Sequence, residues 1–102
     1  MDSQLKHGIL PFCILKILKK QDQYGYDIVK IIQQYIPDTE ESTIYAILRR
    51  LNKDQLTETY SGSVSNGPVR KYYKISKLGE EQLKEYIDSW RVLTNFFKEL
   101  DT

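Results

Sequence analysis

Apolar residues recur at helical spacing in the middle of the chain. Ile44, Ile47, Leu48 and Leu51 follow the i, i+3, i+4, i+7 pattern of a stripe that faces a protein core. This spacing predicts a helix that runs to about Asp54. Similar patterns predict two earlier helices, at about residues 5–19 and 25–35. The first half of the chain is therefore expected to be helical.

The opposite side of this third helix is small, polar and cationic. At about 100° per residue, Ser42, Ala46, Arg49 and Lys53 centre on that side, and Tyr45 flanks it. Small residues near a helix start allow close approach to a major groove, hydroxyl groups bond phosphates or bases, and arginine forms two hydrogen bonds with guanine. Two interpretations stand at this point: a DNA recognition helix, or an ordinary amphipathic surface helix.

Two β-prone runs follow the helix, at residues 56–60 and 69–75. The segment between them, residues 61–68, is rich in Gly, Ser, Asn and Pro, which is typical of a hairpin turn. Side chains alternate along a strand, so Arg70 and Lys71 are expected on opposite sides of the hairpin. A helix-turn-helix followed by such a hairpin is a winged helix, in which the second helix of the pair enters the groove and the wing contacts phosphates.

Residues 77–100 predict a last helix with a heptad-like seam. Two sets of apolar residues repeat every seven positions along it, namely Leu83, Trp90 and Phe97, and Tyr86, Leu93 and Leu100. A chain of 102 residues has little else to cover such a seam, so we expect it to meet a second subunit. The competing interpretation folds this helix back as a core element of a monomer.

Charge is distributed unevenly, although the net charge is only +1. Residues 42–77 carry seven Lys and Arg against two Asp and Glu, a balance of +5. The flanking segments are acidic, with −1 for residues 1–41 and −3 for residues 78–102. Cationic charge is thus concentrated where the third helix and the hairpin would contact DNA.

Composition favours one globular domain and excludes a membrane protein. Apolar residues make up 40% of the chain and charged residues 28%, which is normal for a globular protein and not for a disordered one. No apolar run approaches the roughly 20 residues of a membrane span, and no signal peptide is recognisable at the N-terminus. We therefore expect a cytoplasmic protein with no membrane partner.

Enzymatic and metal chemistry have no support in the sequence. Cys13 is the single cysteine and lies in an apolar run, so we expect a buried thiol that acts as a small hydrophobic residue. His7 is the single histidine, and with no Cys or His cluster there is no metal site. Because no His-supported nucleophile, Gly-rich phosphate loop or carboxylate pair is evident, we predict a protein that is not an enzyme and holds no cofactor.

Three segments of the chain resemble the signature blocks of PadR-type transcriptional regulators. They are Tyr-Gly-Tyr-Asp-Ile at residues 24–28, Ser-Thr-Ile-Tyr-Ala-Ile-Leu-Arg-Arg-Leu at residues 42–51, and Gly-Pro-Val-Arg-Lys-Tyr-Tyr-Lys-Ile-Ser-Lys-Leu-Gly at residues 67–79. The third block is the most specific, and the resemblance runs from about Leu5 to Leu100. It implies a winged helix that binds double-stranded DNA and dimerises through its C-terminal helix.

Asp88, Ser89 and Trp90 resemble the small multidrug-sensing branch of that family, the LmrR type. The resemblance implies that the Trp90 rings of two protomers form a slot that stacks flat aromatic compounds. By position, the slot would also include Leu5, Phe12, Ile87, Leu93 and Thr94. Thr94 departs from the branch, where an acidic residue helps to accept cationic drugs, so a cation preference is not implied here. A closed, packed seam is the alternative.

These observations together predict a mainly α (α+β) winged helix-turn-helix with a C-terminal dimerisation helix. Residues 1–76 would form the DNA-binding domain and residues 77–102 the dimerisation helix, as one compact unit. The expected function is a homodimeric repressor that binds a pseudo-palindromic operator and releases it on binding a planar aromatic effector, if it has an effector. The alternative is a protein–protein adaptor that uses the fold without DNA.

The predicted sites comprise three groups of residues. The DNA-binding residues are Ser42, Thr43, Tyr45, Arg49, Lys53, Asn66, Arg70, Lys71 and Tyr72. The effector-binding residues are Leu5, Phe12, Ile87, Trp90, Leu93 and Thr94. The dimer interface comprises Leu83, Tyr86, Trp90, Leu93, Phe97 and Leu100. No catalytic or metal-binding residue is expected.

Overall fold

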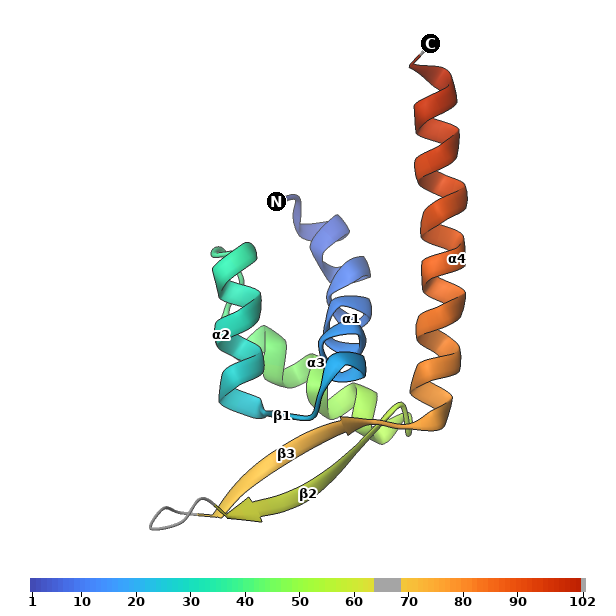
Figure 1. The fold of residues 1–102 in the computed structure, drawn as a ribbon. Coiled ribbons are helices and arrows are strands. Elements are labelled where there is room, and N and C mark those ends of the chain that lie inside the picture. The colour runs from blue at the N-terminus through green and yellow to red at the C-terminus, as the bar shows by residue number, and fades with distance from the viewer. Residues whose placement is uncertain (64–68, 102) are drawn as a thin grey trace.

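A computed structural model describes residues 1–63 and 69–101. The elements are α1 (Ser3–Lys20), β1 (Gln23–Tyr24), α2 (Gly25–Tyr35), α3 (Glu41–Lys53), β2 (Thr57–Ser63), β3 (Val69–Ile75) and α4 (Lys77–Leu100). The first three helices lie on one side of a small sheet, and α4 extends away from it (Figure 1). The fold is a winged helix-turn-helix with a long C-terminal helix, which confirms the predicted fold class.

Helix α1 runs through the centre of the molecule. It begins at Ser3, where the Asp2 carboxylate accepts a hydrogen bond from the Leu5 N–H at 3.0 Å and so caps the helix. The helix continues through Pro11, so this proline neither ends α1 nor moves its start. One side of α1 is fully buried and supplies the middle of the core, with Leu10, Ile14, Leu15 and Leu18.

Helices α2 and α3 form the helix-turn-helix pair. Helix α2 contributes Ile28, Val29 and Ile32 to the core, and α3 contributes Ile44, Leu48 and Leu51. The predicted stripe of α3 is therefore confirmed, with Ile47 half-buried at its edge. Helical spacing alone would place Tyr35 on the same side of α2 as Ile28 and Ile32, but its side chain is 77% exposed. Ile32 is buried in the core and Ile36 packs against it, so the core side of this helix end passes through these two residues and not through Tyr35.

The sheet has the strand order β1-β3-β2, and both pairs of strands are antiparallel. Tyr73 and Ile75 of β3 face the helices and are buried. Strand β1 is absent from the sequence prediction, because two residues are too few for a periodic pattern. Its pairing with β3 connects the segment after α1 to the hairpin.

Helix α4 begins against the sheet and then leaves the rest of the protomer. The Ser76 hydroxyl donates to the Gln55 carbonyl at 2.7 Å and accepts from the Gly79 N–H at 3.0 Å, which caps the helix. Leu83 is buried, whereas every described residue from Asp88 onward is exposed. The molecule consequently measures 58 × 30 × 21 Å. No described helix has the length and hydropathy needed to cross a membrane.

Candidate nucleic-acid interface

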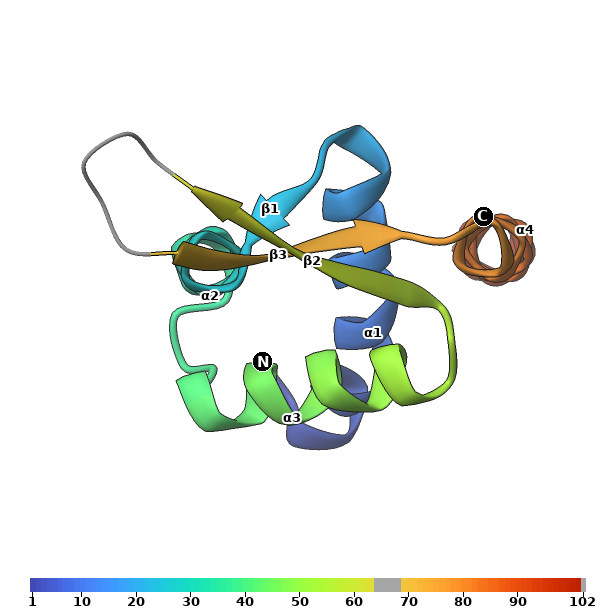
Figure 2. The ribbon, with the colours of Figure 1, turned by 90° about the horizontal axis from the view of Figure 1, so that it is seen from below.

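The outward face of α3 has the predicted composition. Ser42, Ala46, Arg49 and Lys53 are all exposed, while the opposite side of the helix is buried in the core. Figure 2 shows α3 along one edge of the molecule, with the β2–β3 hairpin running to one end and α4 at the other. The small and cationic side of α3 is therefore accessible next to the hairpin.

Two of the predicted DNA-binding residues on α3 lie partly inside the protein. Thr43 and Tyr45 are half-buried, and Tyr45 packs at the edge of the core. The Tyr45 ring lies so close to the start of α2 that a Cβ at Gly25 would be 3.2 Å from its Cε1 atom. Burial, and secondarily the Glu41 carboxylate, raises the pKa of Tyr45, which keeps its hydroxyl neutral and able to donate a hydrogen bond.

The cations of the hairpin occupy both of its faces. Arg70 places its guanidinium carbon 4.8 Å from the centre of the Tyr24 ring, on the face away from the helices. Lys71 is exposed on the other face, with its ammonium 5.5 Å from the centre of the Tyr73 ring. The two predicted phosphate contacts therefore approach a partner from different sides. Asn66, another predicted DNA-binding residue of the wing, lies outside the described residues.

Three tyrosines form a ladder across the outer face of the sheet. Tyr72 pairs with Tyr24 of β1 and with Tyr60 of β2, and the Tyr60 and Tyr72 rings stack at 5.6 Å with only 14° between their planes. The Tyr60 hydroxyl donates to Asp22 at 2.6 Å. This hydrogen bond raises the pKa of Tyr60. Tyr72, predicted as a DNA-binding residue, is thus the centre of a ladder that ties the wing to β1.

Sequence reasoning missed Tyr24 and Tyr60 as part of this interface. The available signal was weak: Tyr60 ends one β-prone run, and the Tyr-Gly-Tyr block supplies Tyr24. Nothing local indicates that the two side chains flank Tyr72, because that depends on the strand order. The ladder supports the hairpin from which Arg70 projects.

Most of the predicted dimer-interface residues are exposed on the protomer. Tyr86, Trp90 and Leu93 are about two-fifths exposed, and Phe97 and Leu100 more than half. Leu83 differs, since it is 3% exposed and belongs to the protomer's own core. Its place in the seven-residue repeat suggested a single seam, but the first turns of α4 pack onto α1 and the sheet. The exposed apolar surface of α4 also includes Val92 and Phe96.

The predicted effector-binding residues fall into two groups. Ile87, Trp90, Leu93 and Thr94 lie on α4, with Ile87 half-buried and the others exposed. Leu5 and Phe12 lie on α1. The two helices meet at Phe12 and Tyr86, whose ring centroids are 6.0 Å apart. The Thr94 hydroxyl donates to the Arg91 carbonyl at 3.1 Å, which is a hydrogen bond within α4 itself.

Phe12 also lines a second apolar feature that the sequence did not indicate. A groove of about 300 Å³ lies between α1 and α2, with Phe12, Cys13, Lys16, Ile17, Ile31, Ile32, Tyr35 and Ile36 along it. Cys13 is half-buried in this groove, so its thiol is less buried than expected. Burial raises the pKa of the Cys13 thiol. The described residues contain no group of three or more His, Cys, Asp or Glu that could hold a metal ion.

Comparison with known proteins agrees with this geometry. The family described as "Transcriptional regulator PadR-like family" matches residues 14–85. An uncharacterised protein from Lysinibacillus sphaericus is 37% identical over 91 residues, which cover 86% of this chain and 84% of that protein.

Solved structures extend the similarity to nearly the whole chain. A PadR-like transcriptional regulator from Bacillus cereus has a TM-score of 0.88 and 35% identity, with 96% of each chain covered. A transcriptional regulator from Streptococcus has a TM-score of 0.87 and 30% identity, covering 99% of this chain and 100% of that one. These matches do not single out the multidrug-sensing branch. PadR-like proteins are DNA-binding regulators and not enzymes, and this chain belongs to the PadR-like family of transcriptional regulators.

Proposed function

We propose that the protein is a repressor that binds a pseudo-palindromic operator as a homodimer. The observation that carries the proposal is the division of α3 into a buried side and an exposed side. Ile44, Leu48 and Leu51 fix the helix on the core, and this leaves Ser42 and Arg49 in solvent. In the proposed complex this exposed side enters the major groove, where Arg49 binds a guanine.

The wing contributes affinity that does not depend on sequence. Arg70 and Lys71 lie at the end of the hairpin away from α4, where they can reach phosphates that flank the groove. Each cation that neutralises a phosphate releases counterions and makes binding dependent on salt. Membership in a family of DNA-binding regulators supports this function over the adaptor alternative.

A second copy of the chain is the proposed partner of α4. The apolar side chains on its second half, including Trp90, Leu93 and Phe97, are 43–61% exposed in the single chain. Two such helices packed together would bury these side chains and hold two recognition helices in one complex. A pseudo-palindromic site with half-sites about one DNA turn apart, roughly 34 Å, follows from that symmetry.

The proposed effector is a planar aromatic compound between the Trp90 rings of the two protomers. Trp90 is 43% exposed, so its indole has room for a stacking partner in the protomer. A ligand could weaken operator binding only by preferring a dimer arrangement in which the recognition helices no longer match the half-sites. Thr94 supplies no negative charge near the slot, which leaves cationic ligands without an advantage.

Selection of bound sequences from a random duplex pool, followed by mutagenesis, tests the DNA-binding proposal. Arg49→Ala should cost about 1–3 kcal/mol on the selected operator and relax base preference there. Arg70→Ala and Lys71→Ala should weaken binding to every duplex and flatten the salt slope by about one unit each. Lys84→Ala removes one positive charge at an exposed position of α4 and is the matched control. It should change neither the base preference nor the salt slope.

Two results would count against this assignment. Equal losses on operator and random duplex for all three variants would remove the division of labour between α3 and the wing. A wild-type protein that is not retained on duplex DNA, at any salt concentration, would favour the protein–protein adaptor.

Trp90 fluorescence tests the effector proposal, because Trp90 is the single tryptophan. Planar compounds should quench its emission saturably, with neutral and cationic compounds of similar shape binding about equally. Thr94→Asp should shift the preference toward cations. By linkage, a ligand that weakens operator binding must bind the DNA complex more weakly by the same factor. Emission that stays unchanged across a panel of planar dyes would contradict the slot.

A further inference from the structure

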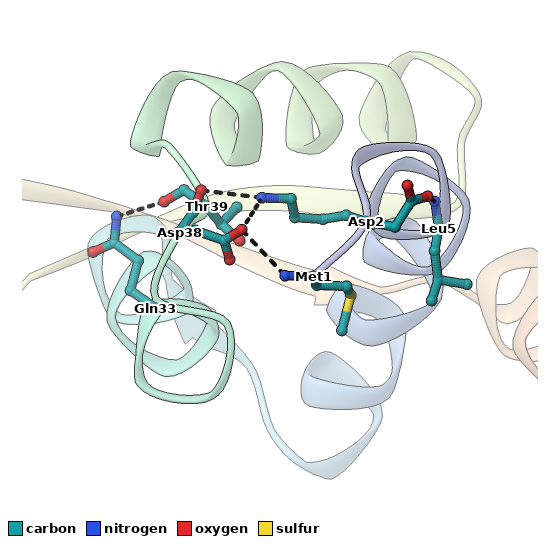
Figure 3. Close-up of polar contacts among 7 residues, drawn as sticks. Met1, Asp2, Leu5, Gln33, Asp38 and Thr39 are labelled. Carbon is teal, nitrogen blue, oxygen red and sulfur yellow. Dashed lines mark hydrogen bonds and ion pairs between the residues drawn. The ribbon is translucent and has the colours of Figure 1, made fainter.

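The turn between α2 and α3 is held in place by α1. The Lys6 ammonium, on α1, donates to the Asp38 carbonyl at 3.0 Å and lies 3.2 Å from the Asp38 carboxylate. The Met1 ammonium lies 3.4 Å from the same carboxylate, and Figure 3 shows Asp38 facing this end of the chain. Residues 32 positions apart in the sequence thus join the first helix to the helix-turn-helix turn.

Helix α3 makes no side-chain cap of its own. Glu40 occupies the N-cap position without a side-chain hydrogen bond to the first turn. The segment before α3 is held instead from α2, where the Gln33 amide donates to the Thr39 carbonyl at 3.0 Å (Figure 3). It is also held from α1 through Lys6. The start of the recognition helix therefore depends on contacts with two other helices.

The Lys6 contact differs from an ordinary surface ion pair. Exposed pairs contribute little because water screens them and two long side chains must be ordered. The Asp38 side chain is 53% exposed, so the ion pair itself is partly screened, but the Lys6 side chain is only 14% exposed. Its other partner is a backbone carbonyl, which moves only with the turn itself. A displacement of α1 at Lys6 is consequently transmitted to the turn.

Lys6 also lies next to the exposed side of α1. Leu5, its neighbour, is 49% exposed, and further along the helix Phe12 meets Tyr86 of α4. We propose that Lys6 is a positioning residue, which sets the placement of α3 on DNA by holding Asp38 and thereby couples α1 to the recognition helix. The inference rests on the proposed DNA contact of α3. It identifies α1, through Lys6, as the element that sets the placement of α3.

Two substitutions with opposite effects on charge test the proposal. Lys6→Met removes a positive charge and both contacts with Asp38, whereas Asp38→Asn removes a negative charge and the ion pair but keeps the backbone carbonyl that accepts from Lys6. The measured quantity is the ratio of affinity for the selected operator to affinity for a random duplex. Lys6→Met should lower this ratio by about three- to tenfold, and Asp38→Asn should lower it by a smaller factor. Lys16→Met, at an exposed position of the same helix, is the matched control and should leave the ratio unchanged.

The ratio separates placement of α3 from loss of fold. A partly unfolded variant loses both affinities by the same factor, because only the folded fraction binds either duplex. Without DNA, the amide resonances of Glu41 and Ser42 should shift in both variants but not in Lys16→Met.

A pure charge effect would weaken the binding of Lys6→Met to both duplexes and tighten that of Asp38→Asn, with the affinity ratio constant. That result would overturn the proposal. An unchanged ratio in both variants with normal affinities would overturn it as well. If Arg49→Ala also leaves the ratio unchanged, the recognition-helix assignment itself has failed. If Arg49→Ala lowers the ratio and the two contact variants do not, the positioning role of Lys6 alone has failed.

Discussion

Gly79 lies where α4 starts against the sheet, and no side chain fits there. A Cβ at this position would collide with the carbonyl oxygen of Leu56 and lie 2.8 Å from Cγ1 of Ile75. The first neighbour is backbone, so it can yield only if the segment entering β2 shifts. The Leu-Gly pair at the end of the third sequence block therefore has a packing reason as well as a place in the helix start.

Gly79→Ala should lower the free energy of unfolding by about 1–3 kcal/mol, because the added methyl group overpacks this contact. Urea denaturation followed by circular dichroism measures the change. Glu81→Ala, two positions along and exposed, should stay within about 0.5 kcal/mol of the wild type. Equal stability of the two variants would mean that the helix start is not tightly packed.

The burial of Tyr45 shows what a helical pattern predicts less well. Helical spacing placed Tyr45 at the flank of the outward face of α3, and the structure buries half of it. The reason is the close approach of α2, where a Cβ at Gly25 would lie within 3.2–3.3 Å of the Tyr45 and Tyr73 rings. A flanking position on a helix can face solvent or a neighbour, and only the neighbouring element decides which.

At the scale of elements, contacts among tyrosines on the outer face of the sheet hold the wing in place. The Tyr72 ring lies over Gly62 of β2, so that a Cβ there would collide with the ring. Tyr72 in turn contacts Tyr60 and Tyr24, and Arg70 stacks on Tyr24. The glycine thus permits a ladder that sets the direction of the hairpin.

Gly62→Ala should displace the Tyr72 ring, lower stability by about 1–3 kcal/mol and weaken binding to random duplex DNA. If the wing then loses its Arg70 phosphate contact, the salt slope should flatten by about one unit, as for Arg70→Ala. Binding is measured by fluorescence anisotropy over a range of salt concentrations. Ser61→Ala, exposed on the neighbouring strand position, is the control. Wild-type stability and slope in Gly62→Ala would refute the bracing role.

At the scale of the whole molecule, α4 has a buried first part and an exposed second part with different structural roles. Leu83 belongs to the core of its own protomer, whereas Leu93 and Phe97 are 44% and 61% exposed. The repeat of seven that joins Leu83 to Phe97 therefore does not describe one continuous interface. The first turns of α4 attach the helix to the winged domain, and the exposed remainder carries the proposed contact with a second copy.

Leu93→Glu combined with Phe97→Glu should give a folded monomer, because the charges disrupt only the proposed contact between protomers. Leu83→Glu should instead unfold the chain, since a buried unpaired charge costs several kcal/mol. Sedimentation velocity reports the mass and circular dichroism the fold. A dimeric double variant would move the interface away from this part of α4, and a folded Leu83→Glu would contradict the assigned core.

The sequence by itself determined the helices, the hairpin, the apolar stripe of α3 and the concentration of positive charge around the wing. These features depend on the periodicity and composition of neighbouring residues, so each can be recognised from its own segment of the sequence. Even the end of α4 at Leu100 follows from its own pattern.

Only the tertiary structure decided which side chains meet. The two-residue strand β1, the contact of Lys6 with Asp38, the hydrogen bond of Tyr60 to Asp22 and the burial of Leu83 join segments far apart in the sequence. The last of these explains why an apolar repeat alone could not distinguish a core position from an exposed one. A local pattern fixes which side of an element is apolar, but the packing of whole elements determines what that side touches.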